Sequence, residues 1–248
     1  MEEPYDRLWG MSKQGQKGRV SLDRALSKLG MSSRTEAKAL IEGGRVRVHG
    51  SIEKNPARMV NPDTAHIEID GKKAEKSGTR LIIFHKPKGV LTTKRDPEGR
   101  KTIYDVLPLE LHGLHPVGRL DQHTSGLLLL TNNTRLSSDL TDPKNRILRI
   151  YLAGVQGEVT DSTLEKMTSG IRDGGELLKA ERAQVLKRSG KESLIELGLT
   201  EGKYREVRRL CMALGHEVRS LKRIRFGEYV LGDLKPGDWV DAVLDQAD

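Results

Sequence analysis

The sequence predicts an α+β protein in which a small helical module precedes a larger domain with a mixed, mainly antiparallel sheet. The first observation is helical periodicity near the N-terminus, where the apolar residues at 22, 25, 26 and 29 share one helix face. The second is a series of strand-like apolar segments spread over residues 80–248. The third is a polar, glycine-bounded stretch at 72–79, which predicts a linker between the two parts.

The length of 248 residues fits two unequal domains, which we expect at 20–71 and 80–248. Residues 1–19 alternate glycine with polar residues and show no periodicity. We therefore expect a flexible tail ahead of the small module.

In the small module, helix boundaries are marked by capping residues. Ser21 is placed to cap the first helix, and Gly30 to end it in a left-handed conformation. Ser33 and Glu36 have the spacing of a capping box for a second helix, which Gly43-Gly44 ends. We expect strands to follow at 45–49 and 64–69.

In the larger domain, apolar runs and helical spacing define further elements. We expect strands at 81–85, 147–156, 193–199 and 217–225. We expect helices at 134–140, 162–169 and 204–214. In the last helix an apolar stripe lies on one face and three arginines lie on another.

The positive charge is concentrated in two windows. The chain has a net charge of +8. Residues 21–60 hold eight basic and four acidic residues, and residues 201–225 hold eight basic and three acidic ones. Two basic patches on a nearly neutral body indicate a polyanion bound at two places, although solvated helix faces are the simpler alternative. With 2 Trp, 5 Tyr and 2 Phe, the chain cannot line a broad stacking platform, so binding would rest mostly on Lys, Arg and backbone.

Several classes of protein are excluded or disfavoured. The apolar runs are far shorter than the roughly 20 residues of a membrane span, and the N-terminus lacks the apolar stretch of a signal peptide. A single cysteine, Cys211, permits no internal disulfide, and we expect a reducing, cytoplasmic setting. No G-x-G and no P-loop occur, which disfavours dinucleotide-dependent enzymes and P-loop NTPases, and His112, His115 and His123 lack the spacing of a metal site.

One segment, residues 115–131, carries the chemistry. It presents Arg119 and Asp121 after a polar turn and then enters an apolar run. If the segment is extended there, both side chains lie on one side, because strand side chains repeat every two residues. A neighbouring cation keeps a carboxylate ionised, as a nucleophile or base must be. The alternative is a structural ion pair that holds a loop.

The run Val117–Asn132 (VGRLDQHTSGLLLLTN) resembles the signature of the RsuA/RluB-type ribosomal RNA pseudouridine synthase family. The resemblance extends to Lys86-Pro-Lys-Gly89 and to the segments 96–102, 201–210 and 221–227. The small module resembles the ribosomal-protein-S4-like RNA-binding unit that is often fused to these enzymes. One departure is Asn133-Thr134, where the family usually continues with Asp-Gly; it is expected to alter a turn and the start of the next helix.

The resemblance implies an isomerase that detaches a uracil from its ribose in RNA, rotates it and rejoins it through carbon, with no cofactor or metal. Asp121 would be the catalytic carboxylate, whether it attacks the sugar, attacks the base or removes a sugar proton. Arg119 would place the flipped nucleotide and balance Asp121, Tyr151 would stack on the base, and Lys203 would pair with Asp121. The simpler alternatives are a core strand residue for Tyr151 and a solvated charge for Lys203. Leu197 or Leu199 would pack against the base.

The remaining RNA would be held by the two basic patches. The predicted RNA-binding residues are Arg24, Lys28, Arg34, Lys38, Arg45 and Arg47 in the small module, and Arg205, Arg208 and Arg209 beside the cleft. We expect a monomer that acts on large-subunit (23S) ribosomal RNA and does not bind membranes. The alternatives are a small-subunit (16S) substrate, an inactive RNA-binding assembly protein, and a different RNA enzyme such as a methyltransferase.

Overall fold

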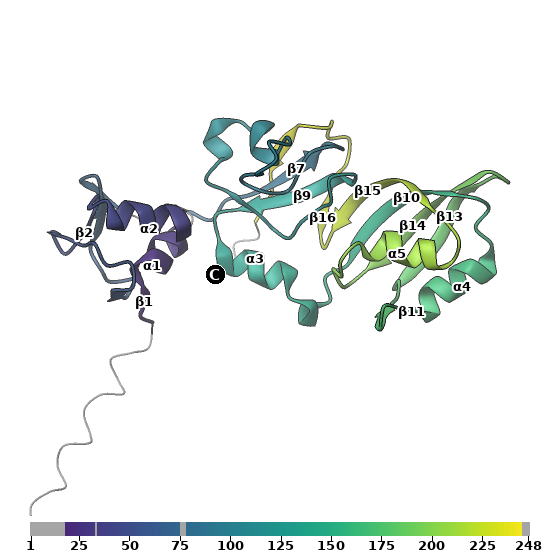
Figure 1. Cartoon of the computed structure of the whole chain (residues 1–248), viewed down its shortest axis with the longest axis horizontal. Helices are drawn as coiled ribbons and strands as arrows, with labels where there is room; N and C mark the ends of the chain where they lie inside the picture. The colour runs from purple at the N-terminus through teal and green to yellow at the C-terminus, as the bar shows by residue number, and fades with distance from the viewer. Residues whose placement is uncertain (1–17, 33, 75–77, 245–248) are drawn as a thin grey trace, which may run out of the picture. The chain divides into compact units, whose positions relative to one another are not determined.

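The computed structural model describes residues 18–32, 34–74 and 78–244. The chain forms two compact units that divide between Gly78 and Thr79 (Figure 1). Almost all of the predicted tail lies outside the described residues, as does Ser33 of the predicted capping box. The predicted linker is described only in part, and its first two residues pair with a strand of the first unit.

The first unit packs two helices against short strands. The helices are α1 (Leu22–Lys28) and α2 (Arg34–Glu42). The strands are β1 (Val20–Ser21), β2 (Val46–Val48), β3 (Ser51–Ile52), β4 (Met59–Val60), β5 (Ile67–Ile69) and β6 (Lys72–Lys73). They form the pair β1-β4 and a sheet of order β3-β2-β5-β6. The apolar helix faces that periodicity predicted are buried together in one core.

The ends of α1 show which capping predictions hold. Gly30 has φ +75°, and the amides of Gly30 and Met31 donate to the carbonyls of Ser27 and Leu26, both at 3.1 Å. This is the Schellman arrangement that a glycine end predicts. Ser21 occupies the N-cap position, but its hydroxyl donates to the Asp23 carboxylate rather than capping the helix backbone. That part of the capping prediction is wrong, because the nearby carboxylate is the stronger acceptor.

The second unit is built on one large sheet. Its strands are β7 (Leu81–Lys86), β8 (His115–Pro116), β9 (Ser125–Thr131), β10 (Arg149–Gln156), β13 (Arg182–Arg188), β14 (Glu192–Leu199), β15 (Val218–Phe226), β16 (Tyr229–Val230) and β17 (Trp239–Asp241). The order is β13-β14-β10-β15-β9-β7-β17, with β16 on β15 and β8 on β9. Among the described residues β15 and β9 pair in parallel and the other pairs of this sheet are antiparallel. The predicted mixed, mainly antiparallel sheet is confirmed.

Helices α4 (Asp161–Ser169) and α5 (Glu206–Ala213) cover one face of the sheet at the β10-β14-β13 end, and α3 (Thr134–Thr141) lies near β9 (Figure 1). A hairpin of β11 (Ile171–Asp173) and β12 (Glu176–Leu178) packs beside α5. Three short 3-10 helices complete the unit: η1 (Ile103–Asp105), η2 (Leu109–Leu111) and η3 (Pro143–Asn145). In the described part of the chain, no helix has the length and apolarity needed to span a bilayer.

Two residues explain local features of this unit. Gly126 has φ +105°, and a Cβ there would lie 2.2 Å from the Arg223 carbonyl oxygen, so only glycine allows β9 and β15 to pair. Asn133, at the departure from the family pattern, caps α3: its side-chain oxygen accepts from the amides of Arg135 and Leu136 at 3.0 and 3.1 Å.

Candidate active site

Asp121 lies in a loop between β8 and β9 that is fixed by backbone contacts on both sides. The Thr92 hydroxyl donates to the Leu120 carbonyl at 2.8 Å. The Gly89 amide donates to the Gln122 carbonyl, also at 2.8 Å. The two residues that flank Asp121 are therefore both tied to the segment after β7, which fixes the backbone that carries the carboxylate.

Lys86 holds the same loop through hydrogen bonds of its side chain. Its side chain is fully buried, and Nζ donates to the carbonyls of Thr124 at 2.8 Å and Pro87 at 3.0 Å. Burial lowers the pKa of this lysine to about 8, and the nearby negative charge of Asp121 opposes that shift. The motif Lys86-Pro-Lys-Gly89 thus holds the loop that carries Asp121, through the Lys86 side chain and the Gly89 amide.

Asp121 faces a cavity of about 440 Å³ within the second unit. The cavity is walled by the loop 117–124, β10, the loop 201–205, the first turns of α5 and β15. Its charged lining residues are Arg119, Asp121, Arg149, Glu201, Lys203, Arg205, Glu206, Arg208 and Arg223. Six of these nine are basic, so the cavity is suited to an anionic ligand. The sequence prediction that Asp121 lies in a basic cleft is consistent with this lining.

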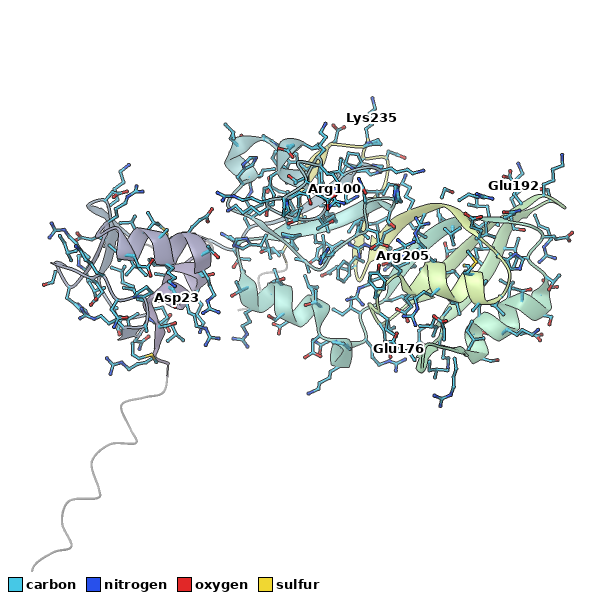
Figure 2. The ribbon with its side chains drawn as sticks, viewed as in Figure 1. Asp23, Arg100, Glu176, Glu192, Arg205 and Lys235 are labelled. Atoms are coloured by element: carbon cyan, nitrogen blue, oxygen red, sulfur yellow. The ribbon has the colours of Figure 1, made fainter. Side chains whose placement is uncertain are left out.

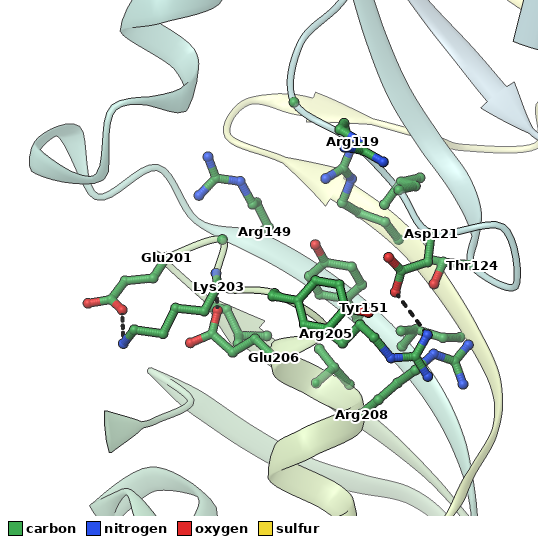
Figure 3. A pocket seen from close by; sticks show the side chains of 18 of the residues that line it. Arg119, Asp121, Thr124, Arg149, Tyr151, Glu201, Lys203, Arg205, Glu206 and Arg208 are labelled. Carbon is green, nitrogen blue, oxygen red and sulfur yellow. Dashed lines mark hydrogen bonds and ion pairs between the residues drawn. The ribbon is translucent and has the colours of Figure 1, made fainter. Parts of the chain in front are cut away.

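The cation beside Asp121 is Arg205. Its Nη1 lies 3.8 Å from Oδ2 of Asp121, and both side chains are about one third exposed (Figure 3). Arg205 has φ +48°, and this left-handed residue immediately precedes α5, which is why the helix begins later than predicted. The left-handed turn places the guanidinium beside the carboxylate.

The expected pairing of Lys203 with Asp121 is wrong. Lys203 is ion-paired with Glu201, and its Nζ donates to the Leu177 carbonyl at 2.8 Å (Figure 3). The loop turns after Lys203, so that its side chain points toward the β11–β12 hairpin. The spacing of the motif could not show which cation, Lys203 or Arg205, lies beside Asp121, because that depends on the left-handed backbone conformation of Arg205.

Arg119 and Asp121 both line the cavity, and Leu120 between them is buried in the core. This alternation agrees with the shared side that their spacing predicts, although residues 119–121 belong to no strand of the sheet. The expected balancing of Asp121 by Arg119 differs from the structure, where the ion pair of Asp121 is with Arg205. Arg119 remains available to a ligand at the cavity wall.

Arg208 contributes differently from a surface cation. It is partly buried, and its guanidinium donates to the carbonyls of His123 at 3.0 Å and Val218 at 3.1 Å. Burial and the charge of Arg205 lower its pKa, and Asp121 opposes this. Arg208 thus ties α5 to the loop that carries Asp121, a role that sequence reasoning missed.

Tyr151 joins the two halves of the sheet. It lies on β10 opposite Leu197 of β14 and Arg223 of β15, and it packs against the core clusters on both sides. It is half-buried and lines the cavity. Of the two leucines left open by the sequence, Leu199 lies on the cavity wall and Leu197 lies in the core beneath it.

Two buried arginines were not anticipated. The guanidinium groups of Arg149 and Arg223 lie 4.5 and 4.9 Å from the ring centroid of Phe226. Arg149 donates to three backbone carbonyls, whereas one terminal nitrogen of Arg223 has no hydrogen-bond partner. In the sequence, a buried arginine of a strand cannot be distinguished from an exposed one, so no pattern predicted the burial of Arg149 or Arg223.

Glu206 is the buried carboxyl of the cavity. It accepts from the Lys203 amide at 3.2 Å, and burial raises its pKa. The contact ties the loop 201–205 to the first turn of α5.

The other predicted RNA-binding residues of the second unit, Arg205 and Arg209, both form ion pairs within the protein. Arg205 belongs to the aspartate pair. Arg209 is ion-paired with Asp173 at 2.6 Å and also pairs with Glu176, so it braces the β11–β12 hairpin. The predicted arginine face of this helix is therefore largely engaged within the protein.

In the first unit the six predicted cations are all exposed. Arg34 pairs at 3.0 Å with Asp23, which Figure 2 labels, while Lys38 pairs with Glu42 and Arg45 with Asp70. Within the described residues, no ion pair to an acidic side chain is present for the remaining three, which are Arg24, Lys28 and Arg47. These three carry the most available positive charge.

No group of three or more His, Cys, Asp or Glu residues is placed to hold a metal ion within residues 18–32, 34–74 and 78–244. His112, one of the three clustered histidines, contacts the Leu107 carbonyl and packs edge-on against Tyr104.

Comparison with known families assigns the class. Residues 80–213 match the RNA pseudouridylate synthase model, and residues 20–65 match the S4 domain model. The chain therefore belongs to the RNA pseudouridine synthases, isomerases of uridine in RNA, and carries an S4 RNA-binding domain. The family resemblance, the α+β architecture and the enzyme class predicted from sequence are confirmed.

Relatives are similar over most of the chain. An "Uncharacterized RNA pseudouridine synthase" of Aquifex aeolicus is 38% identical over 221 residues, which is 89% of each chain. The "Ribosomal large subunit pseudouridine synthase B" of Escherichia coli (strain K12) is 37% identical over 91% of this chain and 80% of its own; that of Vibrio cholerae is 36% identical over 91% and 72%. A solved structure, "Crystal structure of pseudouridylate synthase", is 27% identical, with a TM-score of 0.63, and covers 90% of this chain and 96% of its own.

Proposed function

We propose that this protein isomerises a uridine of large-subunit ribosomal RNA to pseudouridine, with Asp121 as the catalytic carboxylate. The observation that carries the proposal is the position of Asp121. It is braced by backbone contacts, paired with Arg205, and open to a basic cavity that Tyr151 also lines.

The reaction is an internal rearrangement. The bond between N1 of uracil and C1′ of ribose breaks, and a bond between C5 and C1′ forms. The hydrogen on C5 leaves as a proton, and N1 ends with a proton, so the product has the composition of the substrate. The site must therefore hold a detached uracil, assist bond cleavage at C1′ and accept the C5 proton directly or through solvent.

The proposed roles follow from position. The Asp121 carboxylate, paired with Arg205, would act on the ribose or the base in one of the three ways that the sequence left open. The Tyr151 ring would stack on the target base, with Leu199 on the neighbouring wall. Arg119 would contact the flipped nucleotide, and Lys203 would act through the loop rather than on the carboxylate.

Extruding the target base costs a few kcal/mol, which contacts to the rest of the RNA must offset. We propose that the S4 unit supplies part of this binding through its exposed cations, while unit 79–248 carries out the reaction. The large-subunit assignment is supported by relatives of that name at 36–37% identity over about nine tenths of this chain.

We also propose that the protein works as a cytoplasmic monomer without a cofactor. The rearrangement is redox-neutral and takes no atoms from a co-reactant, and the residues around Asp121 all come from one unit of one chain. Product formed in buffer with a metal chelator and no added cofactor, by protein that sediments as a monomer, would meet these expectations.

The test of the proposed function is pseudouridine mapping on ribosomal RNA from cells that lack their own copy of the enzyme. Wild-type protein should create a site in large-subunit RNA, and Asp121→Asn should not, although it binds the RNA. A new site in small-subunit RNA would transfer the assignment to that substrate. Tight binding with no new site for either protein would favour the assembly-protein alternative.

A further inference from the structure

Tyr204 is an exposed aromatic side chain at the cavity that holds Asp121. It is 76% exposed and lines that cavity. Among the Phe, Tyr and Trp side chains that the structure describes, it is the exposed one, since the others are buried or half-buried. An exposed ring at the wall of this cavity offers a flat face on which a base can stack.

The backbone that carries this ring is held by its neighbours. The Arg209 guanidinium reaches the Tyr204 carbonyl at 3.4 Å and is itself fixed by Asp173 at 2.6 Å. The preceding residue, Lys203, donates to the Leu177 carbonyl at 2.8 Å, and its amide donates to Glu206 at 3.2 Å. The ring is therefore presented from an ordered loop, which reduces the entropy lost when a ligand packs on it.

The surroundings favour a nucleic acid base as that ligand. Lys203 and Arg205 flank Tyr204 in the chain, and Arg205, labelled in Figures 2 and 3, lies at the cavity. An aromatic face next to cations is the combination that binds unpaired bases together with their phosphates.

We propose that Tyr204 forms a second base-stacking site, which takes an unpaired nucleobase next to the target uridine. The proposal rests on the proposed function, since it places the target uridine at Asp121 and Tyr151. It assigns the two rings different tasks: Tyr151 contacts the base that reacts, and Tyr204 holds a neighbour that does not.

The test is a cycle of paired changes in protein and RNA. The substrate is the stem-loop of large-subunit ribosomal RNA that the bound protein protects from nuclease, with an abasic nucleotide placed in turn at each unpaired position. Both the dissociation constant and the single-turnover rate are measured for wild-type protein and Tyr204→Ala. Tyr204→Phe and Tyr204→Trp keep a ring, and Leu109→Ala removes another exposed apolar side chain, 82% exposed, as a matched control.

Tyr204→Ala should weaken binding by about 5- to 150-fold, the range for loss of one stacked base, with little change in the rate of bound RNA. One abasic position should weaken wild-type binding similarly and have no further effect in Tyr204→Ala. The Phe and Trp variants and the Leu109→Ala control should bind like wild type.

Unchanged binding by Tyr204→Ala, or independent effects of the variant and of every abasic position, would overturn the stacking site. A wild-type protein that forms no product, yet shows the coupled loss of binding, would instead refute the proposed function and leave the stacking site standing.

Discussion

At the scale of single residues, the site depends on where three cations point. Lys86 is buried beneath the aspartate loop, Arg205 meets Asp121, and Arg208 joins α5 to the loop. None of these contacts follows from spacing in the sequence, because each joins residues that the fold brings together from distant parts of the chain. The motifs therefore identify the residues of the site more reliably than their partners.

Lys86 predicts a pH dependence of stability. Its pKa is about 8 in the folded protein and 10.5 ordinarily, so the folded chain binds fewer protons than the unfolded chain between these values. Stability attributable to Lys86 should therefore rise from pH 8 to pH 10.5, by at most about 3 kcal/mol. Urea unfolding of wild type and Lys86→Met across this range measures it, and a difference between them that stays constant with pH would contradict it.

Arg205 should separate stability from activity. Glycine adopts the left-handed conformation of this residue at no steric cost, so Arg205→Gly should not lower the unfolding temperature. The same change removes the partner of Asp121 and should slow single-turnover isomerisation by roughly tenfold, about 1.4 kcal/mol of barrier. A variant as fast as wild type would show that the ion pair has no part in the reaction.

Cys211 should be inert in the folded protein. It is buried in α5, and burial raises the pKa of its thiol to about 12. A thiol-specific dye at pH 8 should label one cysteine per chain in denaturant and essentially none without it. Rapid labelling of native protein would mean that α5 opens readily.

At the scale of secondary-structure elements, the parallel contact of β9 with β15 holds the site together. It brings the strand that follows Asp121 beside the strand that carries Arg223. Gly126→Ala should cost more than about 2 kcal/mol, because its Cβ would overlap the Arg223 backbone and its φ is positive. Gly113→Ala, with open space around the new methyl, is the matched control, and equal unfolding free energies for both variants would contradict this account.

The sequence predicted the five described α-helices and the strands β2, β5, β7, β10, β14 and β15, since periodicity and capping are local properties; it did not predict β13, β17 or the 3-10 helices. The strands at 81–85 and 193–199 and the helix at 134–140 match the structure within about one residue. The sheet order and the parallel β9–β15 contact were not predictable, because they pair segments about 100 residues apart. The start of α5 was missed because Arg205 adopts a conformation that its residue type disfavours.

At the scale of the whole molecule, charge divides between the two units. In the S4 unit, three of the six predicted RNA-binding cations lack an acidic partner among the described residues, whereas around the cavity most basic groups are braced within the protein. We therefore expect the S4 unit to account for much of the salt-dependent affinity for RNA.

This division can be measured as a salt slope. Replacing Arg24, Lys28 and Arg47 together by alanine should reduce the slope of log affinity against log salt by about 2, since each contact to single-stranded RNA contributes about 0.7. The matched control replaces three exposed lysines of the second unit, Lys187, Lys191 and Lys235. An equal reduction for both triple variants would show that the charge acts only through the overall field of the protein.

The most direct test of the central claim follows the hydrogen that the reaction must release. RNA labelled with tritium at C5 of uridine is incubated with wild-type protein and with Asp121→Asn, and the binding of both is measured on the same RNA. The account predicts that wild type releases the tritium of one uridine per RNA molecule, and that Asp121→Asn binds comparably but releases none. Release by Asp121→Asn at the wild-type rate would contradict the assignment of Asp121 as the catalytic carboxylate.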